Sequence, residues 1–188
     1  MITAMWVVIG IVVLLLVIFF AIYNGLVRLR NQTRNAWAQI DVQLKRRHDL
    51  IPNLVETVKG YKKFERETLE AVTKARNIAV KAASAGAAER GKAEGELGSA
   101  LARLLAVVER YPDLKANQNF LALQEELAST ENKISFSRQY YNDSILNYNN
   151  QTQMFPSSII AAMTGFNAGE FFEVTVAEER EVPKVSFP

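Results

Sequence analysis

The sequence predicts an all-α protein in which an N-terminal transmembrane helix precedes an antiparallel, up-and-down bundle of three to four long helices. Three observations support this prediction. The chain begins with an uncharged apolar run, most of the remainder carries apolar residues at helical spacing, and no alternating strand pattern occurs before the C-terminal tail. The 188 residues carry a formal net charge of only +2 and no cysteine. This composition disfavours nucleic acid as a partner and excludes disulfides and thiolate chemistry.

The apolar run, "ITAMWVVIGIVVLLLVIFFAI", extends from Ile2 to Ile22 and contains no charged residue. Such a helix is about 30 Å long, which matches the hydrocarbon core of a bilayer. A cleaved signal peptide is the alternative, but no basic residue precedes the run and no small-residue cleavage site follows it. We therefore interpret residues 1–23 as a retained single-pass anchor. Its predicted lipid-facing and interfacial residues are Trp6, Leu14, Leu15, Leu16, Phe19, Phe20 and Tyr23.

The residues after the run predict its orientation. Arg28, Arg30 and Arg34 precede the first acidic residue, Asp41, whereas nothing basic precedes the span. The positive-inside rule then places the N-terminus outside and the C-terminal domain in the cytoplasm.

Residues 24–155 form the predicted bundle. Two rows of residues recur every seven positions, one from Trp37 to Ala79 and the other from Ile40 to Ala82. This spacing is typical of helices packed lengthwise on one another. The rows keep their phase across Pro52, which favours one long helix bent at that proline. Alternatively, Asp49 caps a new helix that has Pro52 in its first turn.

In the later part of the bundle, glycine and proline residues predict where helices end, and a second seven-residue repeat predicts the last long helix. The segment "SAGAAERGKAEGE", residues 84–96, indicates a turn with frayed helix ends on both sides. A helix from Leu97 then ends before Pro112. Asp113 is predicted to cap a final long helix, whose core row is Phe120, Leu127, Ile134, Tyr141, Tyr148 and Phe155.

Residues 156–173 are predicted to form a short apolar helix or docking segment, because a helix this short cannot cover its own apolar side chains. The segment can fold back on the bundle, dock on a second copy or touch the membrane. Residues 174–188 are predicted to be an extended or mobile tail. The candidate docking patch consists of Ile159, Ile160, Met163, Phe166, Phe171 and Phe172.

The basic cluster Lys45–His48 lies in the middle of the first predicted bundle helix. His48 and Asp49 are adjacent and point about 100° apart on a helix, so they do not form a base–orienter pair. There is no second histidine for a metal pair. The sequence therefore predicts no catalytic residue, no metal site and no cofactor.

The same cluster contains one residue at a core position. Arg47 lies on the apolar row, and a charge buried there must be paired. We predict pairing with Glu131, with Glu125 or Glu126 as alternatives, so that the pair fixes the helix register. In the other interpretation, the cluster Lys45–His48 captures an anionic ligand.

Three stretches of the chain resemble the LemA family: "YNGLVRLRNQTRNAWAQIDVQLKRRHDLIPNLVETVKGY", "YPDLKANQNFLALQEELASTENKISFSRQYYNDSILNYN" and "FPSSIIAAMTGFNAGEFFE". The resemblance covers almost all of Tyr23 to Glu173, with Phe64 standing where members commonly have histidine. It implies a bacterial cytoplasmic (inner) membrane protein with one span and a helical bundle. It implies no established enzymatic activity. Family members often occur near membrane metalloproteases or TPM-domain proteins, and a relative in magnetosome-forming bacteria is linked to building membrane compartments.

Together these features predict a non-enzymatic, membrane-anchored scaffold or adaptor that assembles as a homo-oligomer. Its expected partners are the lipid bilayer and a further membrane protein such as a membrane protease, and not nucleic acid. The alternative is a sensor or anionic-ligand-binding module that uses the basic cluster Lys45–His48 and is linked to envelope quality control.

Overall fold

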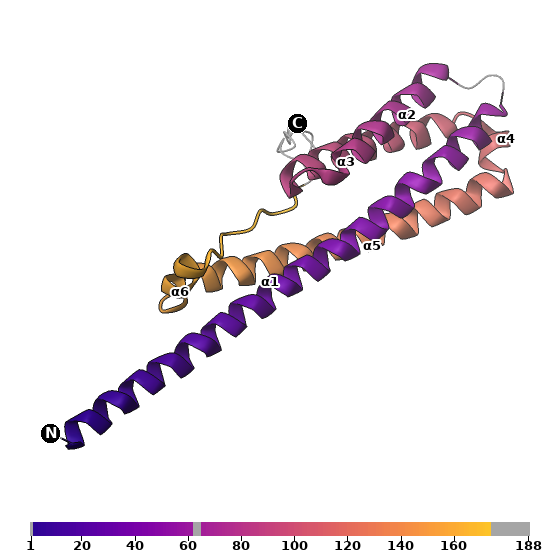
Figure 1. The fold of residues 1–188 in the computed structure, drawn as a ribbon. Helices are drawn as coiled ribbons and strands as arrows, with labels where there is room; N and C mark the ends of the chain where they lie inside the picture. The colour runs from indigo at the N-terminus through magenta and orange to yellow at the C-terminus, as the bar shows by residue number, and fades with distance from the viewer. Residues whose placement is uncertain (1, 62–64, 174–188) are drawn as a thin grey trace, which may run out of the picture. The chain divides into compact units, whose positions relative to one another are not determined.

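A computed structural model describes residues 2–61 and 65–173 of the chain, and all regular structure within them is helical (Figure 1). This confirms the all-α prediction for these residues, whereas the prediction for the tail, residues 174–188, lies outside them. The helices are α1 (Ile2–Lys59), α2 (Arg66–Lys81), the short 3-10 helix η1 (Ala82–Ser84), α3 (Ala87–Val108), α4 (Pro112–Lys115), α5 (Gln118–Gln153) and α6 (Ser157–Thr164).

The chain divides into two compact units. Of the described residues, 2–38 and 139–169 form unit 1, and 39–61, 65–138 and 170–173 form unit 2. Helices α1 and α5 each contribute residues to both units.

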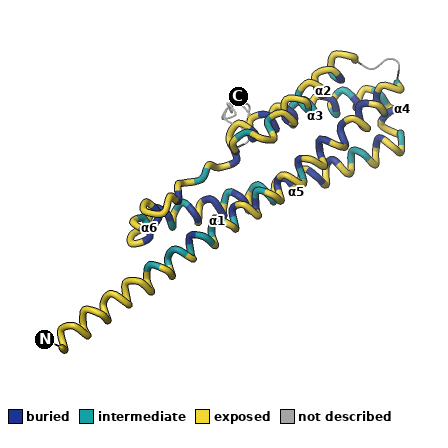
Figure 2. The backbone as a smooth tube through the Cα atoms, in the orientation of Figure 1, coloured by how far each residue is buried: buried dark blue, intermediate teal, exposed yellow. Residues whose placement is uncertain are grey.

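Helix α1 begins with an apolar segment that the rest of the structure leaves uncovered. All residues from 2 to 18 are exposed, shown as the yellow start of α1 in Figure 2. Mean hydropathy reaches 3.2 over an 18-residue window of this helix. By length and composition, α1 can therefore cross a membrane.

The core of unit 2 is built from apolar side chains of five helices. On α1 the predicted rows are buried, since Leu44, Ile51 and Val58 of one row and Leu54 of the other are almost fully covered. Each such side chain contributes on the order of 1.5–3 kcal/mol when it is buried. The partners of α1 in the core cluster include Leu69 and Val72 of α2, Leu97 and Leu104 of α3, Leu114 of α4, and Phe120 and Leu127 of α5.

The prediction that one helix continues along these rows beyond Pro52 is correct as far as Lys59 and wrong beyond it. Helix α1 passes Pro52 without interruption, so Asp49 begins no new helix. The helix then ends next to Gly60, a residue with poor helix propensity. Glu65 is not a core residue, because it is the exposed N-cap residue of α2 and accepts a hydrogen bond from Arg110 Nη2 at 2.9 Å.

The predicted turn at residues 84–96 is also wrong over most of its length. Only Ala85 and Gly86 lie between η1 and α3, and α3 begins at Ala87. The small residues serve close packing instead. A Cβ at Gly91 would collide with the backbone carbonyl of Glu173, so the C-terminal segment passes directly over α3 at this point.

The prediction that Asp113 caps the last long helix is wrong, because Asp113 lies inside the short helix α4. Asn117 takes that role for α5. Its Oδ1 accepts a hydrogen bond from the backbone N–H of Phe120 at 3.1 Å. On α5, four of the predicted core residues after Phe120 are buried, whereas Phe155 lies after the helix end and is exposed.

In unit 1, α6 packs against the part of α1 that follows the exposed apolar segment. The ring of Phe166 lies edge-on to Tyr23 at 5.8 Å, and the guanidinium of Arg30 lies 4.7 Å from the Phe166 ring centroid. Gly165 ends α6 in the left-handed conformation, with φ of 74°, which glycine adopts without strain. The shared core consists of Leu26, Tyr148, Ile160, Ala161 and Phe166, flanked by Phe19, Ile22, Tyr23, Val27 and Leu29.

The chain after α6 is fixed by one side-chain amide. Asn149 donates from Nδ2 to the carbonyl of Gly169 at 3.0 Å and accepts from the Gly169 N–H at 2.8 Å. A Cβ at Gly169 would lie 2.7 Å from Ile145 Cδ1, so only glycine fits this position without rearrangement. Asn149 therefore holds the end of unit 1 to α5.

Candidate functional site

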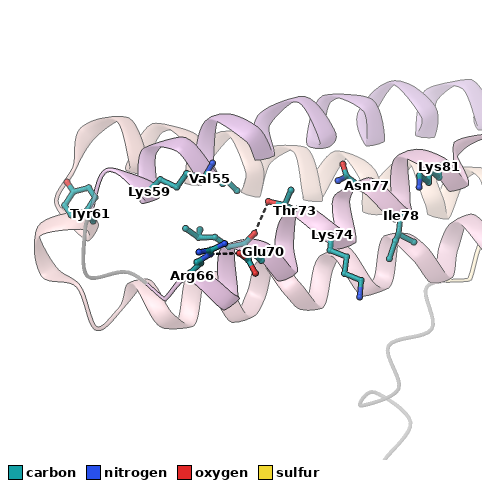
Figure 3. Close-up of a pocket in the computed structure, with 11 residues that line it drawn as sticks. Val55, Lys59, Tyr61, Arg66, Glu70, Thr73, Lys74, Asn77, Ile78 and Lys81 are labelled. Carbon is teal, nitrogen blue, oxygen red and sulfur yellow. Dashed lines mark hydrogen bonds and ion pairs between the residues drawn. The ribbon is translucent and has the colours of Figure 1, made fainter.

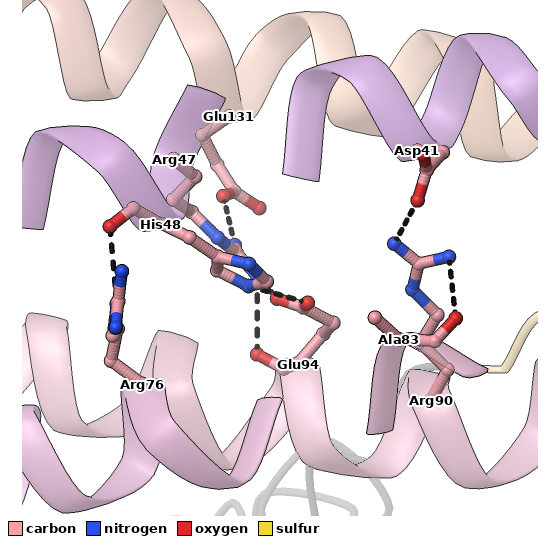
Figure 4. Close-up of polar contacts among 8 residues, drawn as sticks. All are labelled: Asp41, Arg47, His48, Arg76, Ala83, Arg90, Glu94 and Glu131. Atoms are coloured by element: carbon pink, nitrogen blue, oxygen red, sulfur yellow. Dashed lines mark hydrogen bonds and ion pairs between the residues drawn. The ribbon is translucent and has the colours of Figure 1, made fainter. Parts of the chain in front are cut away.

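The most unusual feature of unit 2 is a set of charged side chains inside its core (Figure 4). Arg47 on α1 has a side chain that is only 4% exposed. Its Nη2 pairs with Glu94 on α3, whose side chain is 2% exposed. Its Nη1 donates to Glu131 Oε2 on α5 at 2.6 Å. One guanidinium thus joins three helices, and its two paired carboxylates offset the cost of burying it.

His48 forms a hydrogen bond with the other carboxylate oxygen of Glu94. Its Nε2 lies 2.8 Å from Glu94 Oε1, and because a carboxylate only accepts, Nε2 carries the hydrogen. Burial alone would raise the pKa of the Glu94 carboxyl. The hydrogen bond from His48 and the charge of Arg47 outweigh burial and hold that pKa below its ordinary value. Glu94 is therefore an ionised, fully engaged acceptor.

A second buried arginine repeats this arrangement further along α1 and α3. Arg90 on α3 donates from Nη2 to Asp41 Oδ1 on α1 at 2.6 Å and from Nη1 to the carbonyl of Ala83 on η1 at 3.5 Å. Its side chain is buried while that of Asp41 is half exposed. Two ion pairs, at two positions along the helices, thus join α1 and α3.

A third contact compensates for the proline inside α1. Proline has no N–H, so Pro52 leaves the carbonyl of His48, four residues earlier, without its helical donor. Arg76 on α2 donates from Nε to that carbonyl at 3.2 Å (Figure 4). The irregularity of α1 therefore provides an acceptor for a neighbouring helix.

The chemistry of this network is that of a clamp. Each carboxylate oxygen of Glu94 already has a partner, and the low pKa of that carboxyl does not suit a general acid or base at neutral pH. Residues 2–61 and 65–173 contain no group of three or more metal-ligating side chains. The arrangement links α1, α2, α3 and α5 through hydrogen bonds and ion pairs.

A pocket of about 860 Å³ lies between the end of α1 and α2 (Figure 3). Val55, Leu69 and Ile78 form apolar parts of its lining. Arg66 pairs with Glu70 at 2.6 Å, and within the part of the chain that the structure describes, Lys74 and Lys81 form no ion pair. The pocket therefore combines an apolar lining with unneutralised positive charge.

The structure brings together Arg47 and Glu131, the pair expected from the sequence, and separates the rest of the basic cluster. Arg46 is exposed and lies 3.4 Å from Glu126. Lys45 is exposed, while His48 is buried. Because Arg47 and His48 face the core and are occupied by Glu94, the cluster does not present one continuous anion site.

Glu94 is the principal partner of Arg47 that sequence reasoning missed. A signal for it existed. The apolar row of α3 continues backward from Leu97 through Glu94 and Arg90 at helical spacing. Charged residues on an apolar row indicate a buried ion pair, by the same logic that identified Arg47. The interpretation of this stretch as a turn concealed the row.

The remaining predicted residues fall into distinct environments. Asp49 and Pro52 lie on the exposed side of α1. Trp6, the leucines 14–16 and Phe20 are exposed, while Phe19 and Tyr23 stack on each other with ring centroids 6.4 Å apart. The candidate docking patch is divided, since its buried members are Ile160, Phe166 and Phe172, and its exposed members are Ile159, Met163 and Phe171.

Over residues 2–61 and 65–173, fold and network together define an all-helical protein with one helix able to cross a membrane and a core joined by buried ion pairs. The model of the LemA family matches residues 36–187, most of the chain. The chain belongs to the LemA family. This confirms the resemblance found in the sequence, and the match extends beyond Glu173, where that resemblance ends.

Named relatives agree with this assignment. The chain is 28% identical over 175 residues to magnetosome protein MamQ 2 of Paramagnetospirillum magneticum, covering 80% of this chain and 64% of that protein. It is 27% identical to MamQ of Magnetospirillum gryphiswaldense, with the same coverage. Protein LemA of Metamycoplasma hominis is 27% identical over 89% of this chain and 76% of its own length. The chain thus spans less than two thirds of the MamQ proteins.

Proposed function

We propose that the protein is a non-enzymatic helical scaffold or adaptor of the bacterial cytoplasmic membrane. Residues 1–23 anchor it, the N-terminus lies outside, and an antiparallel bundle of helices spanning residues 24–155 lies in the cytoplasm. One observation carries the proposal. A single helix, α1, contains both the exposed apolar segment and the residues that bind the buried charges of unit 2. Membrane attachment and the domain core are therefore parts of one element.

The buried network supports a scaffold rather than a reactive centre. Its side chains are bound to one another and to backbone carbonyls, which gives rigidity and a fixed register. The MamQ relatives are named as magnetosome proteins, so we extend the proposal to the organisation of a membrane-bound assembly. Self-association into a homo-oligomer is part of the proposal, with a membrane protease as a candidate further partner.

The topology is tested by labelling single cysteines, because the native chain contains none. A membrane-impermeant maleimide should label Ile2→Cys in intact spheroplasts and label Ser129→Cys only after lysis. Labelling of Ser129→Cys in intact spheroplasts would reverse the orientation. Recovery of the unlabelled chain in the soluble fraction would contradict the anchor.

Self-association is tested on the full-length protein extracted in mild detergent. Light scattering corrected for bound detergent should give a mass that is a multiple of the single chain. A mass of one chain across the accessible concentration range would contradict the oligomer while leaving the anchor intact. Co-purifying membrane proteins identified in the same preparation would indicate which partner the scaffold binds.

A second candidate function, binding of an anionic amphiphile, is favoured by the pocket between α1 and α2. Its apolar lining and unpaired lysines suit a ligand with an apolar body and an anionic group. Calorimetric titration of naphthalene-2-sulfonate onto the protein in phosphatidylcholine nanodiscs tests this. The double variant Lys74→Gln/Lys81→Gln should weaken binding several-fold, whereas Lys133→Gln on α5 should not. Equal binding by all three proteins would exclude the pocket.

A further inference from the structure

Four apolar side chains near the end of α5 and on α6 are exposed although the same region contains a packed core. The exposed fractions are 60% for Met154, 81% for Phe155, 54% for Ile159 and 73% for Met163. We call these four residues the α6 crest. A water-facing surface does not normally gather side chains of this size next to one another.

Two crest residues, Ile159 and Met163, lie on α6, and the other two precede that helix. Ile159 and Met163 are one helical turn apart and therefore point in nearly the same direction. Ile160 and Ala161 are buried against α1 and α5 residues. Helix α6 thus carries both buried and largely exposed apolar side chains.

The position of α6 along α1 relates its exposed side chains to the predicted span. The core that α6 shares with α1 includes Phe19, Ile22 and Tyr23, at the end of the predicted span. From Phe19 to Tyr23 the helix rises only about 6 Å. The crest therefore belongs to the same compact unit as the end of the exposed apolar segment.

The charge pattern points to lipid as the occupant. No charged residue occurs between Asp143 and Glu170, a stretch that contains the end of α5, all of α6 and the turn after it. The surface of a soluble domain typically carries charge on about a quarter to a third of its residues. An uncharged, Asn-rich and Gln-rich segment that exposes Met, Phe and Ile is suited to the polar–apolar boundary of a bilayer.

We propose that the α6 crest inserts into the interfacial region of the bilayer, on the side where the α1 span ends. Helix α6 then forms a second, monotopic membrane contact beside the transmembrane helix. This inference rests on the proposed anchoring of residues 1–23. It gives the bilayer two contacts with unit 1, so the unit cannot rotate freely about the axis of α1.

The proposal can be tested by electron paramagnetic resonance on the full-length protein in phosphatidylcholine–phosphatidylglycerol liposomes. A nitroxide is attached to Met163→Cys or, separately, to Ile159→Cys. Leu14→Cys reports the span, and Ser129→Cys, exposed on α5 in unit 2, reports water. The measured quantity is collision with dissolved oxygen, which concentrates in lipid, relative to collision with the water-soluble complex of nickel and ethylenediamine diacetate.

The expected result is an oxygen-to-nickel ratio at both α6 sites several-fold above that of Ser129→Cys and below that of Leu14→Cys. A ratio at α6 equal to that of Ser129→Cys, with Leu14→Cys in lipid, would overturn the inference alone. An aqueous ratio at Leu14→Cys would overturn the proposed anchor as well. Spin–spin broadening at Met163→Cys that disappears on dilution with unlabelled protein would show that a second copy covers the crest, which also overturns it.

Discussion

Units 1 and 2 differ in the surroundings that their side chains require. Unit 2 takes charged groups into its interior and provides each with partners from its own helices, as with Arg47, Glu94 and Glu131. Unit 1 leaves apolar groups uncovered along α1 and on α6. Because apolar surface is favourably removed from water, the exposed apolar side chains of unit 1 are the ones that the proposed membrane contact would cover. On the proposed function, the buried ion pairs of unit 2 stabilise the fold and the exposed apolar residues of unit 1 contact the membrane.

Substitutions in the unit 2 network should change stability by similar amounts in detergent micelles and in lipid bilayers, because their partners are all internal. Circular dichroism of the full-length protein during urea unfolding measures these changes. A change that depended strongly on the lipid would contradict the division of roles between the two units.

The largest loss in the free energy of unfolding is expected from Glu94→Ala. Removing this carboxylate leaves the guanidinium of Arg47 buried with Glu131 alone, and breaking a buried pair costs about 3–5 kcal/mol. Glu126→Ala, which removes the exposed partner of Arg46, is the matched control and should cost less than about 1 kcal/mol. The double variant Arg47→Leu/Glu94→Leu should recover most of the loss. Similar losses for Glu94→Ala and Glu126→Ala would show that the network is not buried in solution.

Smaller changes in stability are expected when Gly91 and Gly98 of α3, which have opposite surroundings, are replaced by alanine. Gly91→Ala introduces a Cβ where the Glu173 backbone lies and should destabilise by about 1–3 kcal/mol, as overpacking does. A Cβ at Gly98 meets nothing within 4 Å. Gly98→Ala should therefore stabilise the helix by about 0.5–1 kcal/mol. If both substitutions stabilise the protein, the C-terminal segment does not pass over α3.

A change of about 1 kcal/mol is expected from Arg76→Leu, which removes the donor to the His48 carbonyl. In a Pro52→Ala background the helix regains its own N–H donor to that carbonyl, so the same substitution should cost less. Urea unfolding of the four proteins in this double-mutant cycle gives the coupling. Additive effects of Arg76→Leu and Pro52→Ala would mean that the proline and the arginine are independent.

The smallest effect expected is a change in acid sensitivity. The pKa of Glu94 is lower in the folded than in the unfolded chain, so its ionisation stabilises the fold at higher pH. This stabilisation is complete above the ordinary glutamate pKa of about 4.3 and is lost as the pH falls through the folded value. Glu94→Gln should therefore unfold with a shallower dependence on pH below that point. An unchanged acid profile would mean that Glu94 is not selectively stabilised as an anion.

The parts of the fold that the sequence predicted are those determined by local periodicity. The apolar segment of α1 and the buried rows of α1 and α5 follow from the residues themselves, and Arg47 on such a row implied an acidic partner. The break at Gly60 was missed because the row on α2 continues in phase with that on α1. Phase alone therefore does not distinguish one helix from two helices that pack on the same core.

The beginning of α3 was missed for a different reason. Small residues such as Gly91 have the same sequence signature whether they form a turn or admit a close neighbour. The neighbour here is the backbone of Glu173, which is remote in the sequence and not readable from the local pattern. The role of Glu94 depended on the same misassigned segment. Local composition alone therefore did not distinguish a turn from the beginning of α3, because the difference depends on a contact remote in the sequence.

Pro52 shows how an imperfection in one helix can select its neighbour. An undisturbed helix offers no free carbonyl to an adjacent chain, so the neighbour can slide by a turn with little penalty. Pro52 leaves one carbonyl, that of His48, without a helical donor. Only the alignment of α2 that brings Arg76 to His48 provides a donor for it. A local defect in α1 thereby excludes the slipped arrangements that repetitive apolar rows would otherwise allow.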